Sequence, residues 1–202
     1  MFNKVFKVVS KVVFIGAVLS LVGCAGSVVN MKEVPDDQAV IKPVSDKATV
    51  VFMRPSSFGF AIQSSVFEIV NEKPELVGIV AAKKKVAYTV DPGKHLFMAV
   101  GESADFMSAE LEAGKIYYAL VTPRMGFWKA RFSLAPIAEG GHASAEFKEW
   151  EAECKLVETI DSSYAWADEN MADLQSKYAE YYAVWMEKDE IERPHLEKNA
   201  GL

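Results

Sequence analysis

The feature that most constrains the fold is a series of short apolar segments between Ala48 and Ile137, separated by turn residues. β-Branched and aromatic residues dominate these segments, and residues 107–112 and 128–134 alternate apolar with polar side chains. Such alternation is typical of strands with one buried and one solvated face. The segments recur about every 8–12 residues without an intervening helical pattern. The spacing predicts a mainly β domain at 48–137, an antiparallel β-sandwich of about seven or eight strands or a small barrel.

Two connections between the predicted strands carry distinct turn signals. The polar stretch Asn71-Glu72-Lys73-Pro74-Glu75 separates the run that ends at Val70 from the next one. In Asp91-Pro92-Gly93-Lys94, proline presets φ for one turn position and glycine supplies a positive φ for the next, which predicts a type II turn. Two-residue hairpins prefer the mirror-image turns, so we expect a longer or splayed connection at Pro92-Gly93.

Residues 138–202 show a helical period instead of a strand period. Apolar and aromatic side chains recur at steps of three and four, with charged residues on the other faces, and they are Ala167, Met171, Leu174, Tyr178, Tyr181 and Trp185. This stripe predicts one helix from Ser163 to Asp189, and a shorter helix is expected at Ala145–Val157. The stripe either packs on the sandwich or the shorter helix, or it serves as a partner-binding or self-association surface, because Tyr and Trp are enriched at interfaces.

The N-terminal segment has the pattern of an export signal. Lys4, Lys7 and Lys11 precede a short apolar run that is too short for an ordinary membrane-spanning helix. The run ends in Leu21-Val22-Gly23-Cys24, which resembles the bacterial lipobox, in which small residues precede a cysteine that receives lipid. We therefore expect residues 1–23 to be a lipoprotein signal peptide and Cys24 to be acylated; the alternative is a chance cysteine after an ordinary signal.

The residue after Cys24 and the segment that follows it suggest where the body resides. Ala25 takes the place of the aspartate that is linked to inner-membrane retention in enterobacteria, so by resemblance to those sorting rules the outer membrane is favoured. Residues 24–47 contain Gly, Pro, Ser and Asp without sustained periodicity, which predicts a flexible lipidated tether. At about 3.3 Å per residue such a tether would lift the body tens of ångströms from the bilayer.

Charge and cysteine content exclude two classes of protein. From Cys24 onward the chain has 19 basic and 28 acidic side chains, a net charge of −9, which repels nucleic-acid phosphates and anionic headgroups. A nucleic-acid partner therefore has no electrostatic support, and membrane attachment depends on the anchor. Acylation of Cys24 would leave Cys154 without an intramolecular partner, which excludes a disulfide scaffold. Cys154 is interpreted as a small packing residue.

The sequence lacks a recognisable catalytic or metal-binding motif. His95, His142 and His195 do not have metal-ligand spacing, and we expect His95 to hydrogen-bond or pack beside its turn rather than act as a base. Glycosidases need two carboxylates at a set separation, but Glu110 and Glu112 are two residues apart on the wet face of a predicted strand. We expect no cofactor, no metal and no catalytic residues.

One group of basic and aromatic residues contrasts with the acidic remainder. It comprises Arg124, Trp128, Lys129, Arg131 and Tyr117, and Arg54 and Phe127 are counted with the wider group. These are either ordinary face and edge residues whose stems cover aromatic rings, or a patch that binds an envelope glycan or a partner protein.

Four sequence blocks, in order, resemble an uncharacterised bacterial lipoprotein family that is catalogued only as a domain of unknown function. The blocks are residues 48–57, 90–95, 113–118 and 125–128, with the lipobox before them. The resemblance implies a β-sandwich and no known activity, so it supplies no site residues. The chain departs from the tight glycine-containing hairpin expected between Val70 and Val80, where the Asn71–Glu75 stretch stands instead.

These observations together predict a non-catalytic, lipid-anchored module of the bacterial outer membrane that faces the periplasm and binds an envelope protein or glycan. An alternative is a peptidoglycan- or glycan-processing enzyme that uses surface carboxylates, and a third is a purely structural, stress-related lipoprotein. The oligomeric state is left open.

Overall fold

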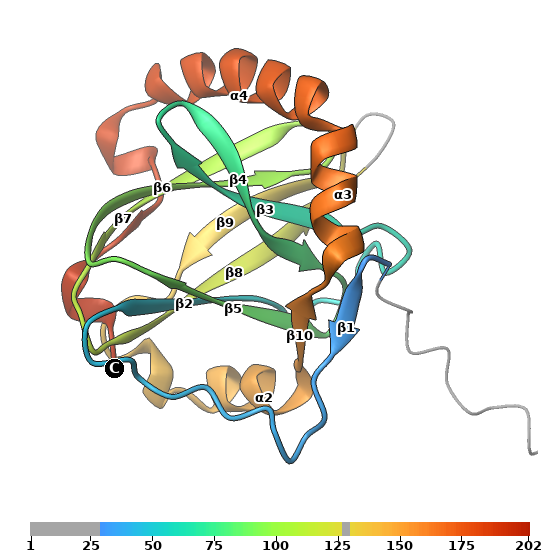
Figure 1. The fold of residues 1–202 in the computed structure, drawn as a ribbon. Coiled ribbons are helices and arrows are strands. Elements are labelled where there is room, and N and C mark those ends of the chain that lie inside the picture. Colours follow the sequence, from blue (N-terminus) through green and yellow to red (C-terminus); the bar gives the residue numbers. More distant parts are fainter. Residues whose placement is uncertain (1–28, 127–129) are drawn as a thin grey trace, which may run out of the picture.

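A computed structural model describes residues 29–126 and 130–202 (Figure 1). The expected signal peptide, Cys24, Trp128 and Lys129 lie outside these residues. The described chain forms four layers, with α4 above one β-sheet, a second sheet below it and α2 underneath.

The strands form two sheets, which we name sheet A and sheet B. Sheet A contains, in spatial order, β1 (Met31–Glu33), β10 (Lys155–Thr159), β5 (Lys84–Val90), β2 (Ala48–Arg54), β8 (Ile116–Arg124) and β9 (Arg131–Pro136). Sheet B contains β11 (His195–Leu196), β7 (Ala104–Leu111), β6 (Gly93–Val100), β3 (Ser64–Val70) and β4 (Lys73–Val80). The strands predicted in the 48–137 region correspond to β2–β9, so the mainly β prediction is confirmed.

The prediction of a purely antiparallel sandwich is wrong, because both sheets are mixed. β2 pairs in parallel with β8, β10 with β5, and β11 with β7. β2 lies between β5, with which it pairs antiparallel, and β8, which the chain reaches only after it has passed through β6 and β7 of the other sheet. β10 and β11 both come from residues 138–202, so the segment expected to be helical also contributes a strand to each sheet.

The near-continuous apolar character of β2 follows from its position between two apolar layers. Val50 and Phe52 belong to the cluster between the two sheets, where the rings of Phe52 and Phe97 meet edge to face at 5.1 Å. Val51 and Met53 point the other way, into a cluster with Phe147 of α2. Alternate residues of one strand therefore enter two different cores, and the whole of β2 is buried.

The C-terminal stripe forms two helices instead of the single predicted one. α3 (Asp161–Glu169) and α4 (Met171–Met186) are separated at Asn170, whose φ of −100° and ψ of 3° interrupt the helix. The side chain of Asn170 donates a hydrogen bond to the carbonyl of Trp166 at 2.7 Å, which satisfies a backbone acceptor at the break.

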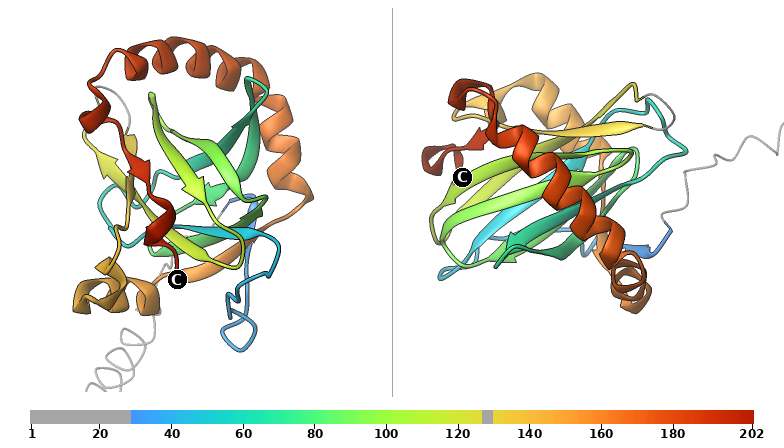
Figure 2. Two further views of the ribbon diagram at one scale, coloured as in Figure 1. Left: turned by 90° about the vertical axis from the view of Figure 1, so that its left-hand side faces the viewer. Right: turned by 90° about the horizontal axis from the view of Figure 1, so that it is seen from above.

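Helix α4 crosses the outer face of sheet B (Figure 2). Leu174 and Trp185 are almost completely buried, and the rings of Tyr182 and Trp185 lie 5.4 and 6.0 Å from that of Phe106 on β7. The interpretation of the stripe as a core-packing face is confirmed.

The expected helix at Ala145–Val157 is shorter than predicted. α2 (Ala145–Glu153) begins after Ser144, whose hydroxyl accepts a hydrogen bond from the amide of Phe147 at 3.0 Å. The chain then becomes extended at Cys154 and continues as β10. Short one-turn helices occur at Gly141–Ala143, Glu190–Glu192 (η2) and Lys198–Ala200.

The connections at Asn71–Glu75 and at Pro92-Gly93 have different structures from those predicted from the sequence. Asn71 and Glu72 both adopt positive φ, so β3 and β4 form a tight hairpin without glycine, and Lys73-Pro74-Glu75 belongs to β4 rather than to a loop. At Pro92-Gly93 the chain crosses from sheet A to sheet B, with Gly93 at a φ of 137°, so β5 and β6 are not a hairpin.

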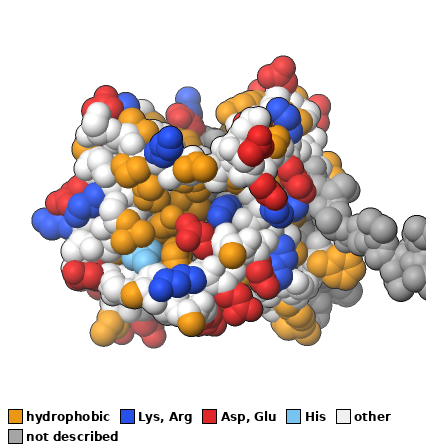
Figure 3. Space-filling view, turned by 90° about the horizontal axis from the view of Figure 1, so that it is seen from below, with side chains coloured by type: hydrophobic (Ala, Val, Ile, Leu, Met, Phe, Trp, Pro, Cys, Tyr) orange, Lys and Arg blue, Asp and Glu red, His pale blue; other side chains and the backbone are white. Residues whose placement is uncertain are grey.

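The expected tether joins the fold much earlier than predicted. β1 pairs with β10 from Met31 onward, and Asp36 forms an ion pair with Lys155 at 2.6 Å. Ile41 packs against the apolar cluster under sheet A, where hydrophobic side chains gather on the underside (Figure 3). The segment from Met31 to Lys47 is therefore part of the body.

Candidate functional site

The structure does not assemble the predicted basic-aromatic patch from the residues that it describes. Arg124 and Arg131 face each other across β8 and β9, but Arg124 lies 3.5 Å from Asp105 and Arg131 lies 3.0 Å from Glu102. Both arginines are about half exposed, so these ion pairs are screened by solvent and partly neutralise the positive charge.

Tyr117 does not belong to that patch, because its side chain is completely buried. Its hydroxyl accepts a hydrogen bond from the amide of Glu112 at 2.9 Å and donates one to the carbonyl of Lys198 at 3.0 Å. Burial raises the pKa of Tyr117. The residue ties the C-terminal segment to the core instead of contacting a ligand.

Arg54 is also buried completely and binds the loop that follows it. Its guanidinium donates hydrogen bonds to the carbonyls of Phe58 and Gly59, both at 2.8 Å, and of Ile62 at 2.5 Å. The same group lies 4.9 Å from the ring centre of Phe132, over its face. Burial lowers the pKa of Arg54 to about 10. Arg54 therefore organises residues 55–62 and is not available to a ligand.

A buried polar cluster connects the two sheets at Glu68, Tyr88 and His95. The hydroxyl of Tyr88 donates to one oxygen of Glu68 at 2.7 Å, and Nδ1 of His95 lies 2.5 Å from the other. Nε2 of His95 lies 2.9 Å from the carbonyl oxygen of Asp91. The two ring nitrogens of His95 thus contact a β3 side chain and the backbone at the β5–β6 connection.

The electrostatics of this cluster favour an ionised Glu68. Burial raises the pKa of Glu68, but hydrogen bonds from His95 and Tyr88 together with the charge of His95 outweigh it, and the net shift is downward. Burial and then the neighbouring Glu68 raise the pKa of Tyr88. His95 therefore hydrogen-bonds beside its turn, as predicted, and the cluster serves as a polar link between β3, β5 and β6.

A groove of about 790 Å³ lies between β9 and the segment Glu190–Glu197. β9 is the edge strand of sheet A, and β11 is the edge strand of sheet B. The groove is lined on one side by Leu134, Ala135 and Pro136 and on the other mainly by charged and polar residues, which are Glu190, Glu192, Arg193, His195 and Glu197.

Arg193 is the basic residue of this groove. Its guanidinium lies over the ring of Trp185, 5.4 Å from the ring centre, and Nη1 donates to the sulfur of Met186 at 3.3 Å. Its Nε is buried without a hydrogen-bond partner in the described chain, and no described carboxylate pairs with it. An arginine that is positioned by an aromatic ring but lacks an acidic partner is suited to bind a carboxylate or another acceptor.

The sequence analysis did not anticipate this groove. In the sequence, Pro194 indicates only that the preceding helix has ended, and residues 134–136 are predicted to be part of another strand. The two segments are about 60 residues apart, and no local pattern brings them together.

A serine–histidine–glutamate arrangement lies at one end of the groove. The hydroxyl of Ser108 is 2.8 Å from Nδ1 of His195, but Nε2 of His195 is 3.7 Å from Glu197, which exceeds hydrogen-bond distance. Ser108 lies within β7, between β6 and β11, rather than on an exposed turn that would present its hydroxyl to a substrate. The geometry is that of a strand-stabilising contact.

Cys154 is a free thiol in the core beneath sheet A. Burial raises its pKa to about 11, so the unreactive thiol form prevails at neutral pH. This environment agrees with its interpretation as a packing residue.

The described residues were also compared with the requirements for a metal site and for a membrane-spanning helix. Within residues 29–126 and 130–202, no cluster of three His, Cys, Asp or Glu side chains is placed to hold a metal ion. Over the same residues, no helix has the length and apolar character needed to span a membrane.

Comparison with known proteins identifies no family: no family model matches the chain, and no curated protein matches it significantly. The family resemblance of the four sequence blocks therefore stays a prediction.

Proposed function

We propose that this protein is a non-catalytic, lipid-anchored module of the bacterial outer membrane that binds an envelope partner in the groove between β9 and residues 190–197. The anchor is Cys24, the body faces the periplasm, and the partner is an extended protein segment that carries a carboxylate.

The observation that carries the binding role is the combination of an open strand edge with Arg193. β9 pairs only with β8 in the described chain, so the backbone groups on its outer edge are free to pair with an extended peptide. Arg193 lies on the opposite wall and offers its guanidinium to an acidic side chain or a chain end. Backbone pairing would supply affinity, and Arg193 would select the partner's charge.

The position of the groove suits a protein that is held at one end. The described chain begins on the right of Figure 1, where the blue segment leads into β1, whereas residues 187–202 descend along the opposite side. An anchor at Cys24 would leave that opposite side, with the groove, accessible from the periplasm.

Site-specific crosslinking tests this proposal. A photoreactive amino acid at Ala135 should capture a partner protein in intact cells, and Arg193→Ala should reduce the yield at least severalfold. The matched control is the same probe at Val184, an exposed position on α4 outside the groove. Equal labelling from Ala135 and Val184, or a yield unaffected by Arg193→Ala, would contradict the binding site.

The anchor is tested separately by fractionation. Wild-type protein should partition with membranes and carry diacylglycerol on Cys24, whereas Cys24→Ser should not. Mature-sized Cys24→Ser protein in the membrane fraction would show that the attachment has another origin.

A glycan-processing enzyme is the second candidate, and the specific observation in its favour is that Glu190, Glu192 and Glu197 line the groove. Glu190, Glu192 and Glu197 are all exposed, whereas a general acid usually needs a desolvated environment that raises its pKa. Release of soluble fragments from purified peptidoglycan, abolished by Glu192→Gln or Glu197→Gln, would establish this candidate in place of the binding module.

A further inference from the structure

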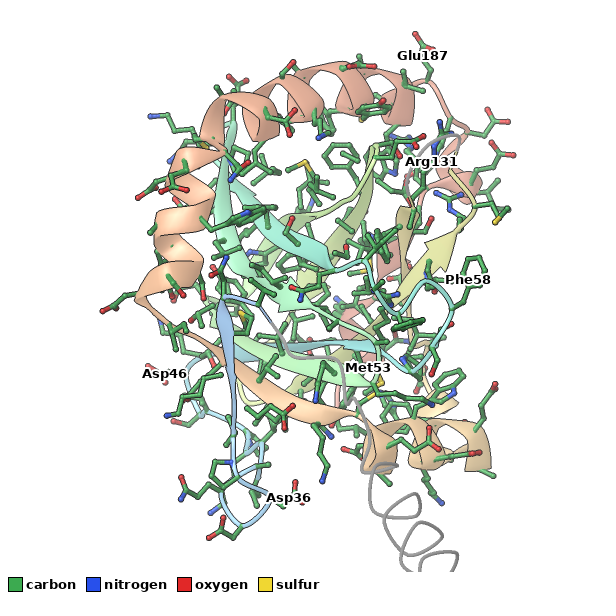
Figure 4. The ribbon with its side chains drawn as sticks, turned by 90° about the vertical axis from the view of Figure 1, so that its right-hand side faces the viewer. Asp36, Asp46, Met53, Phe58, Arg131 and Glu187 are labelled. Atoms are coloured by element: carbon green, nitrogen blue, oxygen red, sulfur yellow. The ribbon has the colours of Figure 1, made fainter. Side chains whose placement is uncertain are left out.

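The loop between β2 and β3 exposes two aromatic rings that are not part of the hydrophobic core. Phe58 is 54% exposed and Phe60 is 71% exposed, and Ile62 beside them is 36% exposed. Phe58 is visible on this loop in Figure 4. Residues 55–63 contain no charged side chain, in a chain of which a quarter of the residues are charged.

The backbone of this loop is held so that the rings point outward. The three carbonyls of Phe58, Gly59 and Ile62 accept hydrogen bonds from the buried guanidinium of Arg54. Gly59 has a φ of 64°, in the left-handed region that favours glycine, which permits the tight turn between the two phenylalanines. These three carbonyl groups, which would be costly to transfer unpaired into an apolar medium, are thus already hydrogen-bonded to a buried side chain.

The chain outside the fold is too short to carry the body far from the anchor. Met31 is 6% exposed and pairs with β10, and the hydroxyl of Ser163 donates to the carbonyl of Asn30. Five residues, Cys24–Val28, precede Val29 in the mature chain. At about 3.3–3.6 Å per residue, Val29 cannot be more than about 18 Å from the lipidated cysteine.

The loop and the start of the described chain are on the same side of the molecule. In Figure 1 both the blue segment that leads into β1 and the β2–β3 loop lie on the right, and Figure 4 views that side directly. Gln63, which ends the loop, lines a small cavity together with Val29 and Asn30. β8 runs parallel to β2, so Met125, which follows β8 and is 82% exposed, is at the same end.

We infer that the Phe58-Gly59-Phe60 turn is a membrane-contacting element that inserts its two rings into the phospholipid bilayer in which the anchor resides. This inference rests on the proposed lipidation of Cys24. The short linker brings the turn to the bilayer, and the uncharged loop avoids the repulsion that the acidic remainder would meet at anionic headgroups. Aromatic side chains in the interface then fix the orientation of the body, with the groove on the side away from the membrane.

An environment-sensitive label tests the inference on the full lipidated protein. Phe60→Cys, and separately Phe58→Cys, would be labelled with a nitrobenzoxadiazole dye in a Cys154→Ala background. The proteins would then be reconstituted in vesicles of phosphatidylethanolamine and phosphatidylglycerol. The dye at either position should shift its emission to the blue and lose most of its accessibility to an aqueous quencher, by about fivefold or more.

The matched control is Ile191→Cys, which is 96% exposed and belongs to η2, in the segment that descends along the side of the molecule opposite β1 (Figure 1). Its label should remain fully quenchable. Labels at Phe58 and Phe60 that are quenched as readily as the one at Ile191 would overturn the inference. Protection that appears without vesicles and grows with protein concentration would also overturn it, because it would assign the turn to self-association.

Flotation of the same vesicles separates this inference from the proposed anchor. Protein that fails to float refutes the anchor itself. Protein that floats while the turn stays in water refutes only the insertion of the turn.

Discussion

The sulfur of Met31 lies 3.4 Å from the backbone nitrogen of Ile79, whose amide donates a hydrogen bond to it. This contact joins β1 to the interior seven residues after Cys24, and it packs Met31 into the cluster between the sheets. β1 is therefore an edge strand of the body that begins at Met31, and the proposed lipid anchor at Cys24 would hold the body close to the membrane.

The first prediction concerns this contact. Met31→Ala should lower the free energy of unfolding by about 2–3 kcal/mol, because it removes a buried side chain from a packed site. Urea denaturation of the soluble Cys24→Ser protein measures the change. Lys32→Ala is the control, since Lys32 pairs with Glu158 only at the exposed surface, and it should change stability by less than about 1 kcal/mol. Equal effects would mean that β1 is not docked.

The second prediction concerns the pH dependence that Glu68 imparts. Its folded-state pKa lies below the ordinary value of 4.5, so the stabilisation is present above about pH 4.5 and is lost as the pH falls through the folded-state value. Glu68→Gln should therefore cost about 1–3 kcal/mol at pH 7, and the difference from wild type should shrink below about pH 4.

The control for Glu68 is Glu75→Gln. Glu75 lies opposite Glu68 on β4 but is exposed, so this variant should unfold like wild type throughout the acid range. Chemical denaturation at several pH values between about 3 and 7 gives the comparison. A gap for Glu68→Gln that stays constant with pH would refute the assignment of a lowered pKa.

The third prediction concerns the buried guanidinium of Arg54. Arg54→Lys cannot reach three carbonyls in the same geometry, so buried acceptors lose their donors and stability should fall by about 2–3 kcal/mol. Chymotrypsin should also cleave more rapidly after Phe58 or Phe60. Arg124→Lys replaces an exposed arginine and should leave the rate of cleavage unchanged.

The fourth prediction concerns the reactivity of Cys154. With a pKa of about 11, its thiolate fraction at pH 8 is lower than that of a free cysteine by about two orders of magnitude. Native Cys24→Ser protein, in which Cys154 is the single thiol, should react correspondingly slowly with an aromatic disulfide reagent, and urea should restore the ordinary rate. Rapid reaction of the native protein would exclude a structural role.

The fifth prediction concerns the attachment of α4 to sheet B. Trp185→Ala should destabilise the protein by about 3–5 kcal/mol, because Trp185 is 5% exposed and packs against Phe106. Its neighbour Val184 is 55% exposed, so Val184→Ala should have little effect. If both variants retain wild-type stability in thermal unfolding, α4 is an appendage and not part of the core.

The functional residues could be predicted from the sequence only where the signal is local. The motif that resembles a lipobox at residues 21–24 is contiguous, so the anchor could be proposed from the sequence alone, although Cys24 lies outside the described residues. The groove joins Ala135 to Arg193, and its open edge depends on which strand ends the sheet. The sequence also did not show that the positive charges of the predicted patch are partly neutralised. Asp105 and Glu102, which form the ion pairs with Arg124 and Arg131, come from a different part of the chain.

The sequence itself determined that residues 48–137 form strands and which face of α4 is buried, because runs of β-branched and aromatic residues favour strands and a helical period of apolar side chains marks the buried face. Only the tertiary structure decided how the strands divide between two mixed sheets and which segments complete them. β10 has a polar, short sequence, and it becomes a strand because Val157 pairs with Val86 on one side and Glu33 on the other. Such pairings join residues about 70 and 120 positions apart, and their backbone hydrogen bonds are independent of side-chain pattern, so no local period can encode them.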